Sequence, residues 1–171
     1  MHVRKLTEAD AAEFQQLRLR ALHDDPEAFS ASYEESRTVP LARVTQRLRE
    51  ESTAGDNCIL GAFEASLVGM VGFLRRQGLK ERHKGFIWGM YVLLDMRGQG
   101  IGKALLSQAI AHAESLPGLV QMQLSVVSTQ EAARHLYRAL GFEAYGVEPR
   151  ALKVREQYLD EELMVLRLPR Q

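Results

Sequence analysis

Apolar residues spaced three and four positions apart predict four helices in this chain. The first starts after Thr7, because a threonine followed by an acidic residue three positions later commonly begins a helix. A second helical pattern follows Pro40 and continues to Leu48, and a short helix or turn is expected before it, within residues 27–37. The other two helices cover residues 102–113 and 130–140, and the last of them ends at Gly141.

Strands are predicted where apolar residues alternate with polar ones or form short continuous runs. The segments are residues 2–6, 58–64, 67–75, 85–92, 119–127, 142–147 and 162–168. Residues 65–66 join two of them at a spacing typical of a hairpin. This order of elements predicts an α/β fold of the α+β kind, with helices packed on a largely antiparallel sheet. Because no internal repeat or long linker divides residues 1–171, we expect a single domain.

The stretch from Trp88 to Ala113 combines a strand, a glycine-rich turn and a helix. Three glycines alternate in the turn, Gly98, Gly100 and Gly102. Backbone N–H groups at the start of the helix can therefore face a phosphate without side chains in between. A Walker loop would need a glycine at Arg97 and a hydroxyl residue at Ala104, and a dinucleotide fingerprint would need a glycine at Lys103. Both of these motifs are excluded.

The hexapeptide from Arg97 to Gly102, RGQGIG, resembles the Arg/Gln-x-x-Gly-x-Gly/Ala signature of the GNAT superfamily of N-acetyltransferases. The segment from Gln130 to Phe142, QEAARHLYRALGF, is similar to the family's second characteristic segment, Asn-x-x-Ala-x-x-Leu-Tyr-x-x-x-Gly-Phe. Gln130 stands where the family usually has asparagine, and its side chain is one methylene longer. Two motifs in the right order identify the chain as a member of this superfamily.

The resemblance implies an acyl-CoA N-acyltransferase fold, a mixed and mostly antiparallel sheet of about seven strands with about four helices. A parallel strand pair would splay apart around the coenzyme. It also implies acetyl-CoA as the acyl donor and direct transfer to a primary amine in a ternary complex. The residues expected to bind the coenzyme are Met90, Tyr91, Val92, Arg97, Gly98, Gln99, Gly100, Ile101, Gly102, Lys103 and Gln130.

Tyr137 is the expected general acid, because a phenol with a pKa of about 10 is protonated at neutral pH and can protonate a departing thiolate. A backbone N–H near Tyr91 or Val92 is expected to stabilise the oxyanion if the strand bulges there. The alternative for Tyr137 is packing, since aromatic residues on amphipathic helices are commonly core residues.

The amine acceptor and the general base are not identified by these motifs. A small amine, an amino acid, a polyamine, an antibiotic, a peptide N-terminus and a lysine side chain all remain open. Candidate acceptor residues are Glu34, Trp88 and Glu148. Candidates for the base are Glu34, Glu35, Glu81, His83 and Glu148. Two other functions remain alternatives, a non-catalytic sensor that binds acyl-CoA and a transferase of a longer acyl group.

Composition and charge limit the classes of molecule that this chain is expected to bind. The 22 lysines and arginines balance 22 aspartates and glutamates, so no basic surface for nucleic acid is indicated. The helical arginines are expected to lie on solvated faces, namely Arg18, Arg20, Arg43, Arg47 and Arg49. No apolar run has membrane-spanning length, and the single cysteine, Cys58, excludes an internal disulfide. Without a signal-peptide pattern or paired metal-ligand spacing, we expect a cytoplasmic protein with no metal and no membrane contact. The family resemblance adds a homodimer as an expectation.

Overall fold

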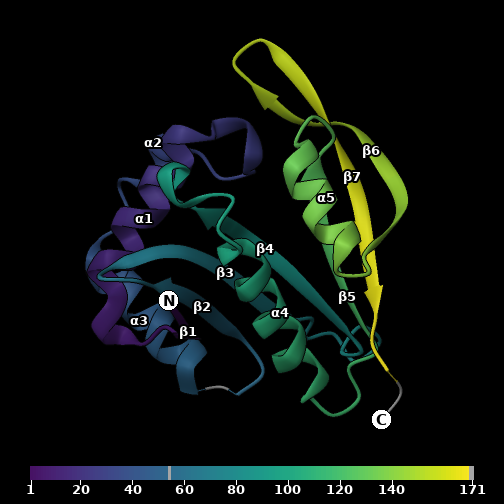
Figure 1. Ribbon diagram of the computed structural model, residues 1–171, viewed down its shortest axis with the longest axis horizontal. Coiled ribbons are helices and arrows are strands. Elements are labelled where there is room, and N and C mark those ends of the chain that lie inside the picture. Colours follow the sequence, from purple (N-terminus) through teal and green to yellow (C-terminus); the bar gives the residue numbers. More distant parts are fainter. Residues whose placement is uncertain (54, 170–171) are drawn as a thin grey trace.

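One seven-stranded sheet runs through the protein in the computed structural model, which describes residues 1–53 and 55–169 (Figure 1). The strands lie side by side in the order β1-β2-β3-β4-β5-β7-β6. β4 and β5 run parallel, and every other neighbouring pair is antiparallel. In chain order the strands are β1 (His2–Lys5), β2 (Cys58–Phe63), β3 (Leu67–Arg75), β4 (Lys84–Val92), β5 (Gln121–Val127), β6 (Glu143–Val154) and β7 (Gln157–Arg167).

Helices connect the strands and cover the sheet. The described α-helices are α1 (Ala11–Asp24), α2 (Tyr33–Ser36), α3 (Leu41–Thr53), α4 (Ile101–Glu114) and α5 (Glu131–Ala139). Short 3-10 helices are η1 (Glu8–Asp10), η2 (Pro26–Ala28) and η3 (Leu94–Met96). The predicted helix start is confirmed, because the Thr7 N–H donates to the Asp10 carboxylate at 2.8 Å. In the described part of the chain, no helix has both the length and the apolar character needed to cross a membrane.

The two faces of the sheet bury separate apolar clusters, since successive strand residues point to opposite sides. Ile59 of β2 packs in a cluster with Phe14 of α1 and Leu48 of α3. Its neighbour Leu60 belongs to the cluster that contains Leu105 of α4. Tyr137 of α5 belongs to that same second cluster. The pairs α1/α3 and α4/α5 therefore cover opposite faces, and the sheet is the middle of three layers (Figure 1).

β4 and β5 separate soon after they meet. Their parallel ladder holds only three residue pairs, from Lys84 opposite Gln121 to Phe86 opposite Gln123. β4 nevertheless continues to Val92 along β3, and β5 continues along β7. The edges of β4 and β5 that face each other beyond Phe86 consequently lack a sheet partner, and their N–H and C=O groups are available to a ligand.

A bulge in β4 lies beside this gap. Met70 pairs with Tyr91 but Gly72 pairs with Trp88, so Gly89 and Met90 together face one residue of β3. Gly89 has a φ of +63°, a left-handed conformation that glycine adopts without strain. The oxyanion donor expected near Tyr91 or Val92 depends on a bulge in the strand, and this bulge lies slightly earlier, at Gly89 and Met90. The bulge begins three residues beyond Phe86, the last residue of β4 that pairs with β5. The role as oxyanion donor stays a prediction.

The C-terminal hairpin is longer than the predicted strands 142–147 and 162–168. β6 continues to Val154 and β7 begins at Gln157, so the hairpin extends past the rest of the sheet (Figure 1). Glu148 consequently lies within β6, opposite Glu161, and not in a connecting loop. The prediction failed because most of this ribbon is exposed on both faces, so it lacks the alternation by which a half-buried strand is recognised.

Candidate active site

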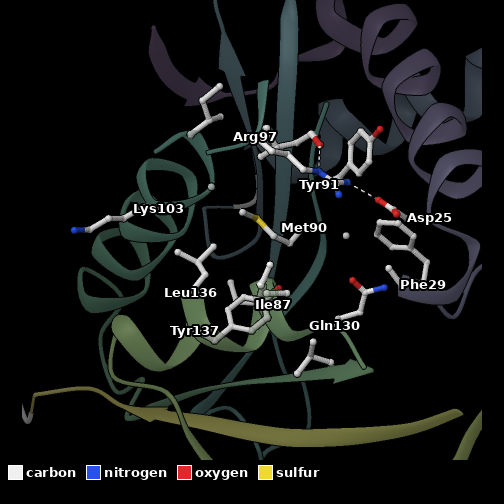
Figure 2. Close-up of a pocket in the computed structure, with 18 of the residues that line it drawn as sticks. Asp25, Phe29, Ile87, Met90, Tyr91, Arg97, Lys103, Gln130, Leu136 and Tyr137 are labelled. Carbon is white, nitrogen blue, oxygen red and sulfur yellow. Dashed lines mark hydrogen bonds and ion pairs between the residues drawn. The ribbon is translucent and has the colours of Figure 1, made fainter. Parts of the chain in front are cut away.

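A cavity of about 380 Å³ opens where β4 and β5 part (Figure 2). Its walls come from β4, the glycine turn with the start of α4, the end of β5, α5, and the segment after α1. The lining residues are 25, 28–29, 87–92, 96–98, 100–103, 125–127, 130, 132–133 and 136–137. The cavity thus brings the two predicted motifs together, although they are far apart in sequence.

The glycine turn presents its backbone to the cavity. Gly98 and Gly100 have φ values of +77° and +81°, and a Cβ on either would meet no protein atom within 4 Å. The first hydrogen bond of α4 runs from the Ala104 N–H to the Gly100 carbonyl at 3.0 Å, so the N–H groups ahead of Ala104 have no partner inside the helix. Unpaired donors, the positive end of α4 and open space on the same side make an anion site.

The side chains of the turn behave differently from its backbone. Gln99 does not line the cavity, and its amide lies near the Asp95 carbonyl at 3.4 Å. Lys103 lies at the cavity but is exposed, and its ammonium points away from Met90 and Tyr137 (Figure 2). Coenzyme contacts by these two side chains therefore stay predictions.

The side chain of Arg97 already interacts with other residues of the protein. Its guanidinium forms an ion pair with Asp25, and its Nε donates to the Val92 carbonyl at 3.1 Å (Figure 2). Beside it, the Tyr91 hydroxyl donates to the Asp24 carboxylate at 3.1 Å. Burial, followed by this contact with Asp24, raises the pKa of Tyr91 to about 12. Arg97 and Tyr91 thus tie the turn and β4 to the end of α1, and the backbone is the part of Arg97 best placed for a phosphate.

Tyr137 reaches the cavity from α5. It is only 6% exposed, its ring packs edge-on against Phe142, and burial alone raises its pKa to about 12. Gln130, which precedes α5, also lines the cavity and lies between Phe29 and Tyr137 in Figure 2. The phenol is therefore a protonated group held at the wall, with the polarity that a general acid needs.

The structure separates the predicted acceptor residues. Trp88 lines the cavity, whereas Glu34 on α2 and Glu148 in β6 are exposed and lie outside its lining. Of the lining residues, Asp25 is the sole carboxylate, and it pairs with Arg97. Sequence reasoning missed Asp25 and Phe29, because their place at the site depends on contacts with residues about sixty or more positions away, which local patterns do not report.

The model of the Acetyltransferase (GNAT) family matches residues 17–142, which include both motifs and the cavity between β4 and β5. The chain belongs to this family. The GNAT assignment and fold made from the two motifs are therefore confirmed, including the parallel pair that splays apart. No group of three or more potential metal ligands occurs in the described part of the GNAT domain.

Solved structures support the GNAT fold over nearly the full length. A GNAT acetyltransferase from Streptococcus pneumoniae is 25% identical, with a TM-score of 0.88, covering 98% of this chain and 99% of that one. The Salmonella typhimurium protein yncA, solved with its cofactor acetyl-CoA, is 25% identical with a TM-score of 0.85, covering 100% and 95%. A ribosomal-protein-alanine N-acetyltransferase from Brucella melitensis is 25% identical with a TM-score of 0.83, covering 98% and 100%.

Proposed function

We propose that the protein is an acetyl-CoA-dependent N-acetyltransferase that moves the acetyl group directly to a primary amine in a ternary complex. One observation carries this proposal. A single cavity holds the glycine turn, the unpaired edges of β4 and β5, and the protonated phenol of Tyr137. These are the groups needed to bind a diphosphate, align an amide-bearing arm and protonate a thiolate.

The residues present fit the coenzyme. Gly98 and Gly100 leave open space where any larger side chain would project, and the N–H groups at the start of α4 would bind the diphosphate. The free edges of β4, from Met90 to Val92, and of β5 would pair with amides of the pantetheine arm. Acetyl-CoA, when bound, supplies an activated thioester carbonyl.

The chain's own groups then act on the transfer. Backbone N–H groups at the bulge of β4 stabilise the negative charge that develops on the carbonyl oxygen. The neutral amine nitrogen bonds to the carbonyl carbon, the carbon–sulfur bond breaks, and Tyr137 donates its proton to the sulfur. The proton that the new amide nitrogen must lose then returns through water to the Tyr137 phenolate. Because Asp25 is engaged with Arg97, we propose that the amine loses its proton to water before attack. The rate should then rise with pH up to the pKa of the acceptor amine.

The test is release of coenzyme thiol from acetyl-CoA in the presence of an amine panel. The panel contains amino acids, polyamines, an aminoglycoside antibiotic, peptides with a free N-terminus, and peptides with a free lysine. Background from the protein should be small, because Cys58 is buried and burial raises the pKa of its thiol to about 11. We expect release that depends on both protein and amine.

Two results would contradict the proposal. Acetyl-CoA binding by calorimetry without thiol release on any amine would favour the sensor. Faster release from longer acyl-CoA thioesters than from acetyl-CoA would favour transfer of a longer acyl group. The predicted homodimer stays a prediction, and sedimentation equilibrium would measure it.

A further inference from the structure

A second cavity, of about 500 Å³, lies between α1 and α3 under the segment that joins them. Three arginines line it, Arg18 from α1 and Arg43 and Arg47 from α3. The only acidic residue among its lining residues is Glu50, which is exposed and accepts a hydrogen bond from the Gln46 amide at 2.9 Å. Arg47 also pairs with Glu51, which lies outside the lining, at 2.8 Å. Among the lining residues themselves, positive charge predominates.

Arg18 is the exception to the expectation that these helical arginines are solvated. Its Nη1 atom is buried and has no hydrogen-bond partner among the described residues. Its guanidinium carbon lies 5.6 Å from the ring centres of both Phe29 and Trp88. Burial, and then repulsion from Arg47, lowers the pKa of Arg18 to about 10. Arg18 is half-buried, and the buried end of its guanidinium has no counter-ion among the described residues, which is unfavourable.

The second cavity shares a wall with the first. Arg47 lies over the Trp88 ring at 4.3 Å, and a Cβ on Gly89 would lie 3.1 Å from Arg18 Nη1. Trp88, Gly89 and Phe29 all line the first cavity. Arg18 and Arg47 therefore lie directly behind the part of β4 whose next residue, Met90, is expected to contact the coenzyme. A ligand bound to Arg18 would be close to the thioester.

Resting on the proposed function, we propose that the second cavity binds the carboxylate of the acceptor, which is a small amine that carries a carboxylate, such as a free amino acid. Arg18 holds the carboxylate together with the Nη groups of Arg47, whose Nε already pairs with Glu51 at 2.8 Å. The amine of the acceptor points toward Trp88 and the first cavity.

Charge selects among the acceptors that the sequence left open. A polyamine or an aminoglycoside would bring further positive charge next to three arginines, which repels it. A carboxylate would instead supply the missing counter-ion and form charge-assisted hydrogen bonds with a planar guanidinium.

The first experiment compares an amino acid with its carboxamide as acceptors, each measured across pH so that the neutral amines are compared. Arg18→Gln is compared with a control variant, Arg49→Gln. The control also removes one positive charge, but Arg49 lies on the surface of α3, where it pairs with Glu8. We expect the wild type to prefer the acid, and Arg18→Gln to lower kcat/KM for the acid roughly ten- to a hundred-fold, mainly through KM. The carboxamide should be affected little, and Arg49→Gln should resemble the wild type.

A second measurement reports binding without turnover. Trp88 is the only tryptophan, so its fluorescence can be titrated with the amino acid in the presence of desulfo-coenzyme A, which has no thiol or acyl group. The signal should saturate in the wild type and shift to at least ten-fold higher concentration in Arg18→Gln. Thermal melting checks that Arg18→Gln is folded. Because Arg18 is an unpaired cation, replacing it should not lower the melting temperature.

The outcomes distinguish the two proposals. Turnover of the acid and the carboxamide with equal kcat/KM, or an unchanged titration in Arg18→Gln, overturns the carboxylate site and leaves the acetyltransferase proposal standing. Absence of turnover with every amine contradicts the acetyltransferase, even when the fluorescence titration shows a carboxylate bound. A large fall in melting temperature for both Arg18→Gln and Arg18→Lys would make Arg18 a packing residue and overturn the inference.

Discussion

Replacing Tyr137 by phenylalanine removes one oxygen from the wall of the cavity and leaves the packing of the ring in place. The ring is 6% exposed and packs edge-on against Phe142 at 6.0 Å between centres, a contact that phenylalanine keeps. The described residues offer the Tyr137 hydroxyl no hydrogen-bond partner, so the variant breaks no hydrogen bond that would matter for stability. The substitution therefore separates chemistry from folding.

Tyr137→Phe should change kcat far more than it changes the free energy of unfolding. General acid catalysis commonly contributes a factor of about 100 to 10,000, so kcat for Tyr137→Phe should fall within that range. Stability should change by less than about 1 kcal/mol, because the hydroxyl lies at the cavity without a hydrogen-bond partner among the described residues and phenylalanine keeps the ring packing. Coenzyme affinity should be unchanged, because the turn from Gly98 to Lys103 is untouched.

The raised pKa of Tyr137 determines how its contribution to the rate depends on pH. A general acid works only while protonated, and burial raises the pKa of Tyr137 to about 12. Tyr137 should thus remain active throughout the neutral and mildly alkaline range, and any loss of rate below about pH 10 must come from another group. The variant should show the wild-type profile at a uniformly lower rate.

Single-turnover thiol release with a saturating amine measures the chemical step, and calorimetry measures coenzyme affinity. Tyr158→Phe is the control, because Tyr158 is 55% exposed in the C-terminal hairpin. If Tyr137→Phe kept single-turnover release within about three-fold of the wild type, far below the usual contribution of a general acid, Tyr137 would be a packing residue.

Three further predictions follow from the same structure. Gly100→Ala should lower the free energy of unfolding in urea by about 1–2 kcal/mol, since its φ is +81°, and should weaken acetyl-CoA binding in calorimetry. Asp10→Asn should destabilise the protein at pH 7 by about 1 kcal/mol after solvent screening. The Arg4 hydrogen bond lowers the pKa of Asp10 to about 2, so this difference between unfolding curves should vanish as the pH falls from 4 toward 2. Cys58 should react with an aromatic disulfide at pH 8 only after unfolding, and rapid reaction of the native protein would contradict its burial.

Local patterns predicted the parts of the protein in which neighbours in sequence act together. The turn from Gly98 to Gly102 needs only its own glycines and the helix that follows. Ala65 and Ser66 mark the turn between β2 and β3, and the predicted ends of both strands are close to the observed ones. These features depend on backbone conformation and on burial at regular spacing, both of which the sequence carries directly.

Features that depend on distant partners were not predictable in this way. Arg97 has the same local pattern whether its side chain binds a phosphate or a carboxylate, and Asp25, its partner, lies 72 positions away. The long ribbon of β6 and β7 is stabilised by pairing between strands and has little buried apolar surface, so its outer half shows no periodicity. Only the folded arrangement supplies this information.

Arg18 and Arg20 show how a residue that departs from its sequence-based prediction can indicate a candidate binding site. Both occur on α1 two positions apart, yet Arg20 is exposed and pairs with Asp24, whereas Arg18 turns inward against the bulge of β4. Glycine inside a strand weakens it, but Gly89 gives β4 both the bulge that faces the coenzyme cavity and the space that admits Arg18. On the opposite side of Trp88, a Cβ on Gly72 would lie only 2.0 Å from the ring, so the indole rests directly on β3. Two strand glycines that stability alone would disfavour thus fix the wall between the two cavities, which separates the proposed carboxylate site from the proposed acetyl site.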